Sequence, residues 1–222
     1  MKQTNASCTS TPLWRTSLTV VALAAATLAS PAQADCQRYG DDDTLDNDDA
    51  CWYLAAGLNY NYLHPDASNS SWRVTDEYDT GAEFAIGYRM SRHFYLEGSY
   101  ANLGTAGLNS LNPLITSTER IDYKVPALWL QYRLYASDVM KSLDGELIGD
   151  DWDIFLRVGM SRMKNDSSST ILPYEAQTRN QYTLGVSLNW NPDDDWGLRL
   201  KLDSYDKDAV SLGISLMRNI GI

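Results

Sequence analysis

Large apolar side chains alternate with small or polar ones along most of the chain after residue 51. The first alternating segment covers residues 52–62, and a side-chain period of two is typical of a β-strand with two unlike faces. Seven further segments repeat the pattern, at 81–90, 94–101, 127–134, 152–161, 182–190, 196–203 and 210–217. The pattern therefore predicts eight strands, each long enough for a tilted strand that crosses a membrane.

The polar face of these segments indicates which environment the strands occupy. In a soluble sandwich, this face would meet water and would be rich in Lys, Glu and Thr. Here it consists mainly of Gly, Ala, Ser and Asn with a few isolated charges. Small residues suit the crowded interior of a narrow barrel, and the large apolar residues would then face lipid. We predict an all-β fold, a transmembrane antiparallel up-and-down β-barrel of eight strands, whose closure satisfies every strand edge in the bilayer.

The joins between strands predict the orientation of the barrel. Short joins at 91–93 and 191–195 belong on the periplasmic side, because outer-membrane barrels have short turns there. Longer polar joins belong on the cell surface, at 65–77, 104–119 and 165–178. Two joins depart from this pattern, a short surface join at 206–208 and a long periplasmic one at 136–151.

Aromatic residues of the apolar face gather at the two ends of the segments. One group lies next to the short turns and contains Trp52, Phe94, Trp152, Trp190 and Trp196. The other group lies at the opposite ends and contains Tyr60, Tyr62, Tyr78, Tyr100 and Tyr182. Two belts of amphipathic rings at the two headgroup levels are typical of membrane barrels.

The first 34 residues have the features of a cleaved signal peptide. Their start is weakly basic without acidic residues, an apolar run follows at 18–28, and Ala32 and Ala34 fit a cleavage site. The apolar run is too short to span a bilayer as a helix. We therefore predict a signal peptide at 1–34, an acidic periplasmic leader at 35–51 and the barrel at 52–222.

The charge of the exported chain excludes nucleic acid as a partner. The chain has a net charge of −11, and the predicted signal removes two basic residues and no acidic one, which leaves −13. Nothing basic enough remains to neutralise phosphates along a nucleic acid. The leader contains seven Asp and one Arg, and such a run can hold Ca²⁺ through oxygen ligands. It lacks the Gly and the terminal Glu of an EF-hand loop, so we expect a solvated leader and no metal or cofactor.

Within the barrel, short motifs resemble the eight-stranded transmembrane domain of outer membrane protein A and its relatives. The resemblance covers residues 52–218, and its motifs are Trp52-Tyr53, Phe94 to Gly104, Asp153 to Gly159, Arg199 and Ser211 to Ser215. This family has a charged network inside the barrel. The resemblance implies that Glu97 is the acidic member, that Arg133 replaces a lysine, and that Arg157 and Arg199 match two arginines. An acidic position of the family is Ser187 here, and Glu83, Lys201, Asp153 and Asp203 are the residues that could compensate.

The function that these features favour is that of a structural outer-membrane barrel with a surface-recognition role. A narrow channel for ions or small solutes is the alternative, and a lipid-modifying enzyme is a more distant one. An enzyme would need a nucleophile or an activated water beside a base, and the mature chain has only His64 and His93, at different ends of the barrel. We expect a monomer without catalytic activity. Its partners would be outer-membrane lipid and lipopolysaccharide, and during biogenesis the assembly machinery and periplasmic chaperones.

We predict a disulfide between Cys36 and Cys51, the even pair that remains after the signal leaves. Export to an oxidising compartment normally closes such a pair, and the alternative is two free thiols. The bond would tie the acidic leader to the first strand and contribute about 3 kcal/mol in the chain-entropy model. Mass spectrometry of alkylated protein taken from the envelope should find no free thiol. Alkylation of both cysteines without prior reduction would contradict the pairing.

Overall fold

The computed structural model describes residues 51–65, 72–112, 118–135, 151–167, 177–192, 195–206 and 209–221. The predicted signal peptide, most of the leader including Cys36, and the join at 136–150 lie outside these ranges. The Cys36–Cys51 pairing and the division at residue 34 therefore stay predictions.

All regular structure in the described ranges is β-strand. The strands are β1 (Cys51–Leu63), β2 (Trp72–Asp76), β3 (Tyr78–Arg89), β4 (Phe94–Ser110), β5 (Thr118–Tyr135), β6 (Trp152–Ser167), β7 (Gln177–Trp190), β8 (Trp196–Asp206) and β9 (Ala209–Gly221). A search of the same ranges finds no helix with the length and hydropathy needed to cross a membrane.

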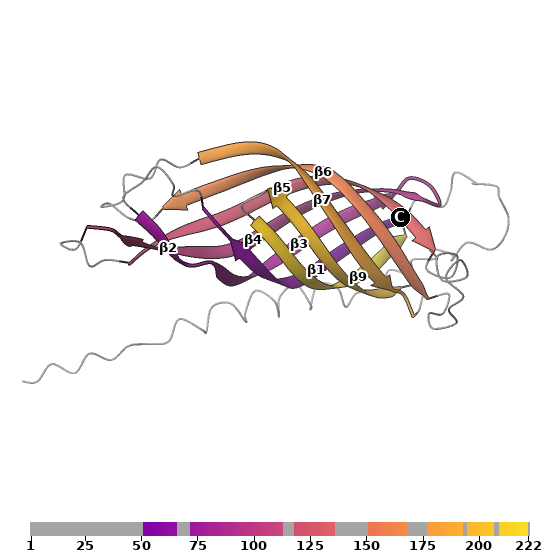
Figure 1. The fold of residues 1–222 in the computed structure, drawn as a ribbon. Helices are drawn as coiled ribbons and strands as arrows, with labels where there is room; N and C mark the ends of the chain where they lie inside the picture. The colour runs from indigo at the N-terminus through magenta and orange to yellow at the C-terminus, as the bar shows by residue number, and fades with distance from the viewer. Residues whose placement is uncertain are drawn as a thin grey trace, which may run out of the picture. The chain divides into compact units, whose positions relative to one another are not determined.

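The strands form a closed antiparallel barrel, which confirms the predicted fold (Figure 1). From β3 to β9, each strand pairs with the next one in the chain, and the first strand β1 pairs with β3 and with the last strand β9, from Cys51–Gly221 to Leu63–Ala209. The short strand β2 and the following β3 both pair with β4 in the same direction, so they act as one interrupted strand of the wall. Counted in this way, the nine strands give an eight-stranded barrel.

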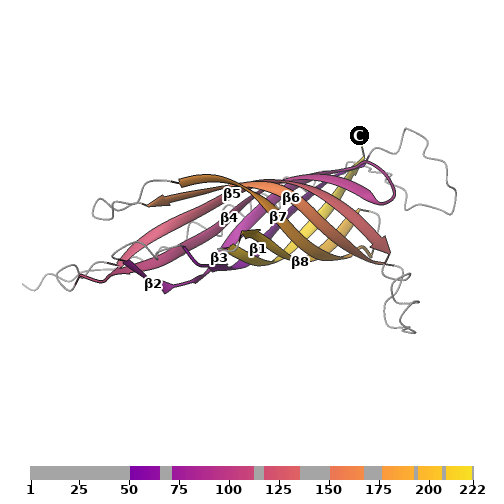
Figure 2. The same ribbon diagram turned by 45° about the horizontal axis from the view of Figure 1, so that its top comes forward.

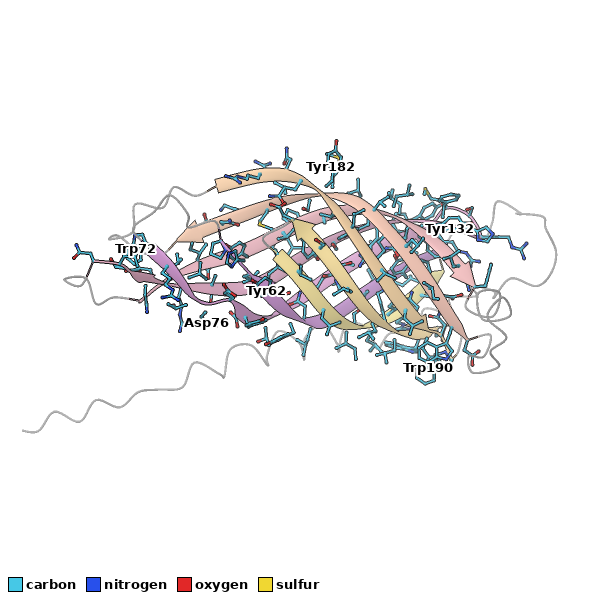
Figure 3. The ribbon with its side chains drawn as sticks, viewed as in Figure 1. Tyr62, Trp72, Asp76, Tyr132, Tyr182 and Trp190 are labelled. Atoms are coloured by element: carbon cyan, nitrogen blue, oxygen red, sulfur yellow. The ribbon has the colours of Figure 1, made fainter. Side chains whose placement is uncertain are left out.

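Burial alternates along each strand as the sequence pattern predicts. In β8, every second side chain is buried in the barrel, while Leu198, Leu200 and Leu202 are exposed on the outside. The outer surface carries a belt of exposed apolar residues, and among its aromatic members Trp52, Phe94 and Trp190 lie at strand ends. Figure 3 shows Tyr132 and Trp190 at the end opposite to Trp72 and Asp76. The large apolar side chains therefore face lipid, as we predict from the composition of the two faces.

The strands extend further on the predicted cell-surface side than the alternation indicates. The predicted join at 65–77 contains β2, and those at 104–119 and 165–178 contain the ends of four strands, β4 to β7. Predicting these stretches as loops was wrong. Beyond the lipid, outward-facing positions are polar and many inward-facing ones are apolar, as with Arg120 and Ile121 on β5. The alternation therefore reverses its sense there although the backbone stays paired.

The height of the wall differs around the barrel. Strands β6 and β7 stay paired as far as Asn165–Gln177, whereas the pairing of β7 with β8 ends at Leu184–Ser204. The β8–β9 connection follows directly at Asp206. The sheet made by β2, β4, β5, β6 and β7 therefore rises above the β8–β9 hairpin, as two views of the ribbon show (Figures 1 and 2).

A β-bulge at Gly104 marks the start of the raised sheet. The register of β4 against β5 shifts between Asn102 and Gly104. Gly104 has a φ of 86°, a backbone conformation that residues with a Cβ rarely adopt. The Asp79 carboxylate accepts hydrogen bonds from the Thr105 backbone N–H at 2.7 Å and hydroxyl at 3.1 Å. These contacts fix the bulge against β3, and with it the direction in which β4 leaves the barrel.

The close approach of β1 to β9 at Gly57 gives a first stability prediction. A Cβ at Gly57 would overlap the Ile214 carbonyl oxygen, a backbone atom that cannot move away, so Gly57→Ala should cost about 1–3 kcal/mol. A Cβ at Gly98 would meet nothing within 4 Å, which makes Gly98→Ala the matched control. Urea unfolding in lipid vesicles measures both variants. Equal unfolding midpoints for the two would contradict this account of β1–β9 packing.

Candidate functional site

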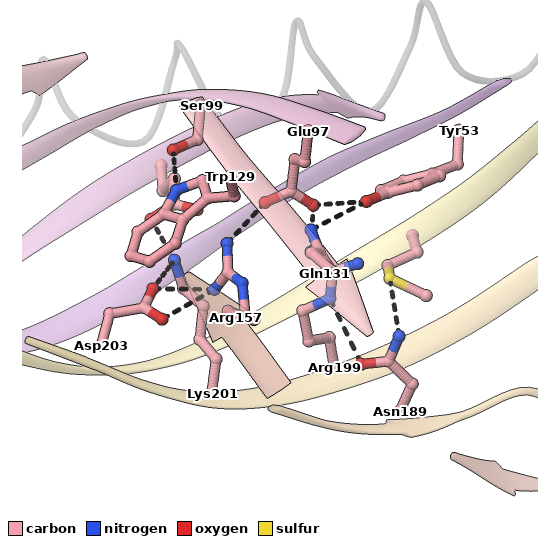
Figure 4. A network of polar contacts seen from close by, with 12 residues as sticks. Tyr53, Glu97, Ser99, Trp129, Gln131, Arg157, Asn189, Arg199, Lys201 and Asp203 are labelled. Atoms are coloured by element: carbon pink, nitrogen blue, oxygen red, sulfur yellow. Dashed lines mark hydrogen bonds and ion pairs between the residues drawn. The ribbon is translucent and has the colours of Figure 1, made fainter. Parts of the chain in front are cut away.

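Glu97 on β4 is the centre of a network of polar contacts inside the barrel (Figure 4). Its carboxylate accepts a hydrogen bond from Tyr53 Oη at 2.6 Å and forms ion pairs with Arg157 at 2.6 Å and Arg199 at 2.5 Å. All four residues come from different strands, and their side chains are buried. The inward positions predicted by the alternation thus bring Glu97, Arg157 and Arg199 together.

The network continues from Arg157 towards β8 and β3. Arg157 Nη1 donates to both carboxylate oxygens of Asp203, at 2.8 and 2.9 Å, and Asp203 forms an ion pair with Lys201 at 3.2 Å. Lys201 is also paired with Glu83. Three acids and three bases therefore alternate along a connected chain of contacts, and their formal charges cancel.

Arg133 does not join this network, so the expectation that it meets Glu97 was wrong. Its guanidinium forms an ion pair with Asp153 at 2.7 Å, and Asn191 donates to the same carboxylate at 3.1 Å. The reason is the register of β5 against β6, because Gln131, not Arg133, is the residue opposite Arg157. Arg133 therefore lies two residues nearer the short turns, in a second cluster at that end of the barrel.

Neutral residues complete the network, and sequence reasoning missed them. Gln131 Nε2 donates to Tyr53 Oη at 3.2 Å, and Arg199 Nε donates to Asn189 Oδ1 at 3.3 Å. The Arg199 guanidinium also lies 5.3 Å from the centre of the Tyr53 ring. The signal that could have found these residues is their inward position in the alternation, which neutral side chains share with the charged ones.

Trp129 joins the charged network to an apolar layer. The Arg157 guanidinium carbon lies 4.3 Å from the centroid of the Trp129 ring. Trp129 Nε1 donates to Ser99 Oγ at 3.0 Å. The Tyr205 ring contacts the indole edge-on, with 5.9 Å between the ring centroids. Beyond Trp129 towards the raised sheet, the interior is mainly apolar, with Asn61 buried in it and donating to the Leu103 carbonyl oxygen at 2.8 Å. The other large buried apolar residues of this layer are Leu63, Leu103, Leu108, Ile121, Tyr123, Val125, Met163 and Tyr205. These eight residues lie beyond the alternating segments, so the small and polar inner face predicted for those segments does not extend into this half of the barrel.

The charged network is stable only as a whole. Taking a charge out of water costs several kcal/mol, and ion pairing repays this only when each charge has good partners. Glu97 has three donors and Arg157 has two carboxylates, so neither charge is isolated. Ser187, at the position where the resembled family has an acid, is buried opposite Lys201. Asp203 and Glu83 supply the negative charge near Lys201 instead.

The two histidines lie apart from the network and from each other. His64 Nδ1 contacts Glu77 at 2.7 Å, and its ring stacks on Tyr62 beyond the end of β1. His93 Nδ1 lies 3.1 Å from the Arg133 carbonyl oxygen, at a short turn. Within the ranges that the structure describes, no three acidic, His or Cys side chains form a group that could hold a metal ion. The acidic leader lies outside those ranges, so its calcium binding is not tested.

Comparisons with known proteins agree with this architecture. The family described as outer membrane protein beta-barrel domain matches residues 20–216. The structure resembles that of the outer membrane protein AlkL in lipid bilayers, with 14% identity over 84% of this chain and 97% of that one and a TM-score of 0.51. It also resembles the outer membrane protein OprG from Pseudomonas aeruginosa, with 11% identity over 78% and 97% of the chains and a TM-score of 0.50. No curated protein matches the sequence.

Neutralising Glu97 gives a second stability prediction. Glu97→Gln keeps the size of the side chain but leaves Arg157 and Arg199 without their shared carboxylate, which should lower the free energy of unfolding by about 3–5 kcal/mol. The matched control is Glu119→Gln on β5, a half-buried acid outside the network. Urea titration of both variants in lipid vesicles provides the comparison. If both variants unfold at the wild-type midpoint, the network does not hold the barrel together.

Proposed function

The chain belongs to the outer membrane protein β-barrel family, and from this premise we propose that it is a structural barrel of the envelope whose bore stays closed. Its place is the outer membrane, where the apolar belt contacts lipid. The observation that carries the proposal is the Glu97 network, because its six charged side chains reach across the bore from both sides.

Two layers support a closed bore. An eight-stranded barrel is just wide enough for side chains to fill it, and here paired charges fill one layer. Large apolar side chains fill the next layer beyond Trp129. A hydrated ion would have to break ion pairs in the first layer and lose its water in the second.

The raised sheet supports a role in surface recognition. Strands β4 to β7 continue beyond the last lipid-facing apolar residues, with the short strand β2 paired along β4. The described strands therefore extend this sheet away from the membrane. We propose that the far end of the sheet meets the cell's surroundings, while the rest of the described barrel serves as its anchor.

A narrow channel remains the second candidate, and one observation favours it. Three inward-facing hydroxyls on β6 and β7, those of Ser161, Thr183 and Ser187, have no hydrogen-bond partner among the residues that the structure describes. Buried hydroxyls usually bind water when no protein group is in reach, so this side of the bore could hold a file of waters. An enzyme finds less support, because the rings of His64 and His93 lie at different ends of the barrel and their recorded polar contacts are with Glu77 and the Arg133 carbonyl oxygen, neither of which is a hydroxyl or thiol nucleophile.

Conductance separates the two candidates. In planar bilayers, the wild-type protein should show little steady current. Glu97→Ala should show more, because it removes the carboxylate that Tyr53, Arg157 and Arg199 bind from three other strands. Glu119→Ala is the control and should behave as the wild type. A steady wild-type conductance that Glu97→Ala leaves unchanged would overturn the closed-bore proposal in favour of the channel.

A further inference from the structure

The end of the barrel next to the short turns contains a cluster of charged and aromatic side chains separate from the Glu97 network. Arg89 on β3 and Arg133 on β5 both approach Tyr95 on β4. The Arg89 guanidinium carbon lies 6.0 Å from the centroid of the Tyr95 ring, and Arg133 Nη1 lies 3.5 Å from Tyr95 Oη. Arg133 also lies over the Tyr135 ring and pairs with Asp153 on β6 at 2.7 Å. We call these five residues, Arg89, Tyr95, Arg133, Tyr135 and Asp153, the mouth cluster.

The mouth cluster contains one base more than it contains acids. Arg89 and Arg133 both occupy inward strand positions, and Asp153 is the one acid at an inward position of the described strands at this end. The Glu97 network, in contrast, balances three acids against three bases. The side chains of Arg133 and Asp153 are 13% and 3% exposed, so water does not fully screen the excess charge. A further negative charge beside Arg89 would therefore stabilise the cluster.

The acidic leader joins the barrel beside Arg89. The pairing of β1 with β3 reaches Trp52–Tyr88, so Cys51 and Arg89 are the next residues along two adjacent strands. Two acids, at positions 48 and 49, precede Cys51 by three and two residues. An extended chain covers about 7–11 Å over two to three residues, so these carboxylates start within a short distance of the Arg89 position.

We propose that the mouth cluster binds a carboxylate of the acidic leader, from Asp48 or Asp49, beside Arg89. A guanidinium binds a carboxylate through two parallel N–H donors, which makes this chemistry specific for an acidic side chain. The bound carboxylate supplies the negative charge that balances Arg89, Arg133 and Asp153. For the leader residues next to Cys51, the proposal replaces the expectation of a solvated chain.

The tether favours the leader over a free acidic peptide or anion. Because the leader is part of the same chain, its carboxylates are present at an effective concentration of about 1 mM or more, without any dissolved ligand. The proposal rests on the prediction that the leader stays in the exported chain, and it does not depend on whether the bore conducts.

The join at 136–150 is the other nearby source of acids, and the topology favours the leader. This join follows Tyr135 on β5, which is separated from β3 by β4. It therefore starts beside Arg133, which already pairs with Asp153. The leader continues into β1, the direct neighbour of β3, and so reaches Arg89 first.

Amide hydrogen exchange of the leader tests the proposal. The full exported chain in lipid nanodiscs is compared with the double variant Asp48→Asn/Asp49→Asn. The protection of residues 44–50 should fall about fivefold in the variant, as expected for the loss of one partly exposed ion pair, and high salt should weaken it in the wild type. Asp41→Asn/Asp42→Asn removes the same charge further from Cys51, and this matched control should exchange as the wild type.

Variants of the cluster test the other partner of the contact. Arg89→Gln should lower the protection of the leader to the same extent and add nothing to Asp48→Asn/Asp49→Asn. Arg218→Gln is the matched control at the same end, because Arg218 lies over the Trp196 ring on the outer side of the wall. Arg89→Glu should also release the leader, and the charge-reversed pair Arg89→Glu/Asp49→Lys should restore its protection. Heat-dependent gel migration checks that each variant keeps a closed barrel.

Two results would overturn the proposal. One is equal leader exchange in the wild type and in Asp48→Asn/Asp49→Asn, whose changes precede the first strand and leave the barrel sequence intact. The other is a recovery of the urea unfolding midpoint of Arg89→Glu by Asp144→Lys in the join and not by Asp49→Lys, because the carboxylate would then come from the join. Protection that does not depend on salt would contradict an ionic contact in the same way.

Discussion

A lipid bilayer offers no hydrogen-bonding partner to the protein backbone, and this constraint governs the whole molecule. An open sheet would leave two edges of unpaired N–H and C=O groups in hydrocarbon, so the strands close on themselves through β1 and β9. Closure with eight strands fixes a narrow interior and assigns alternate residues to lipid and to the bore. The exposed leucines of β8 and the buried Arg199 and Lys201 between them follow directly from this geometry.

Within the closed wall, the interior is divided into a charged layer and an apolar layer. The charged layer is neutral as a whole, since Glu97, Asp203 and Glu83 are each shared with the bases around them. Trp129 belongs to both layers, because one part of its indole contacts Arg157 and another part contacts Tyr205. This arrangement lets a barrel contain many buried charges and still pack tightly along the rest of its length.

The sequence was sufficient to predict the fold class and the lipid-facing surface, because lipid imposes apolar residues at every second position. The sequence was not sufficient to predict that the strands continue beyond the membrane. In the upper parts of β4 and β6, residues such as Thr105 and Lys164 face an aqueous side, and a paired strand there has the composition of a loop. Part of the charged network was also predictable, since Glu97, Arg157 and Arg199 are charged residues on the inward face. The position of each residue along the barrel axis was not, because alternation gives the face but not the register, and Gln131 takes the place expected for Arg133.

The pairing of β1 with β9 has a consequence for how the protein is made. Every other pairing among the described strands joins strands that are next to each other or one strand apart in the chain, so those contacts can form as soon as the two strands exist. The seam between Cys51 and Gly221 joins the two extremes of the sheet and can form only after the final strand has left the ribosome and been exported. A chain that ends before β9 would form the other strand pairings but could not close the barrel, because β1 would have no partner on that side. Only a chain that contains β9 can therefore pair both edges of its sheet in the bilayer.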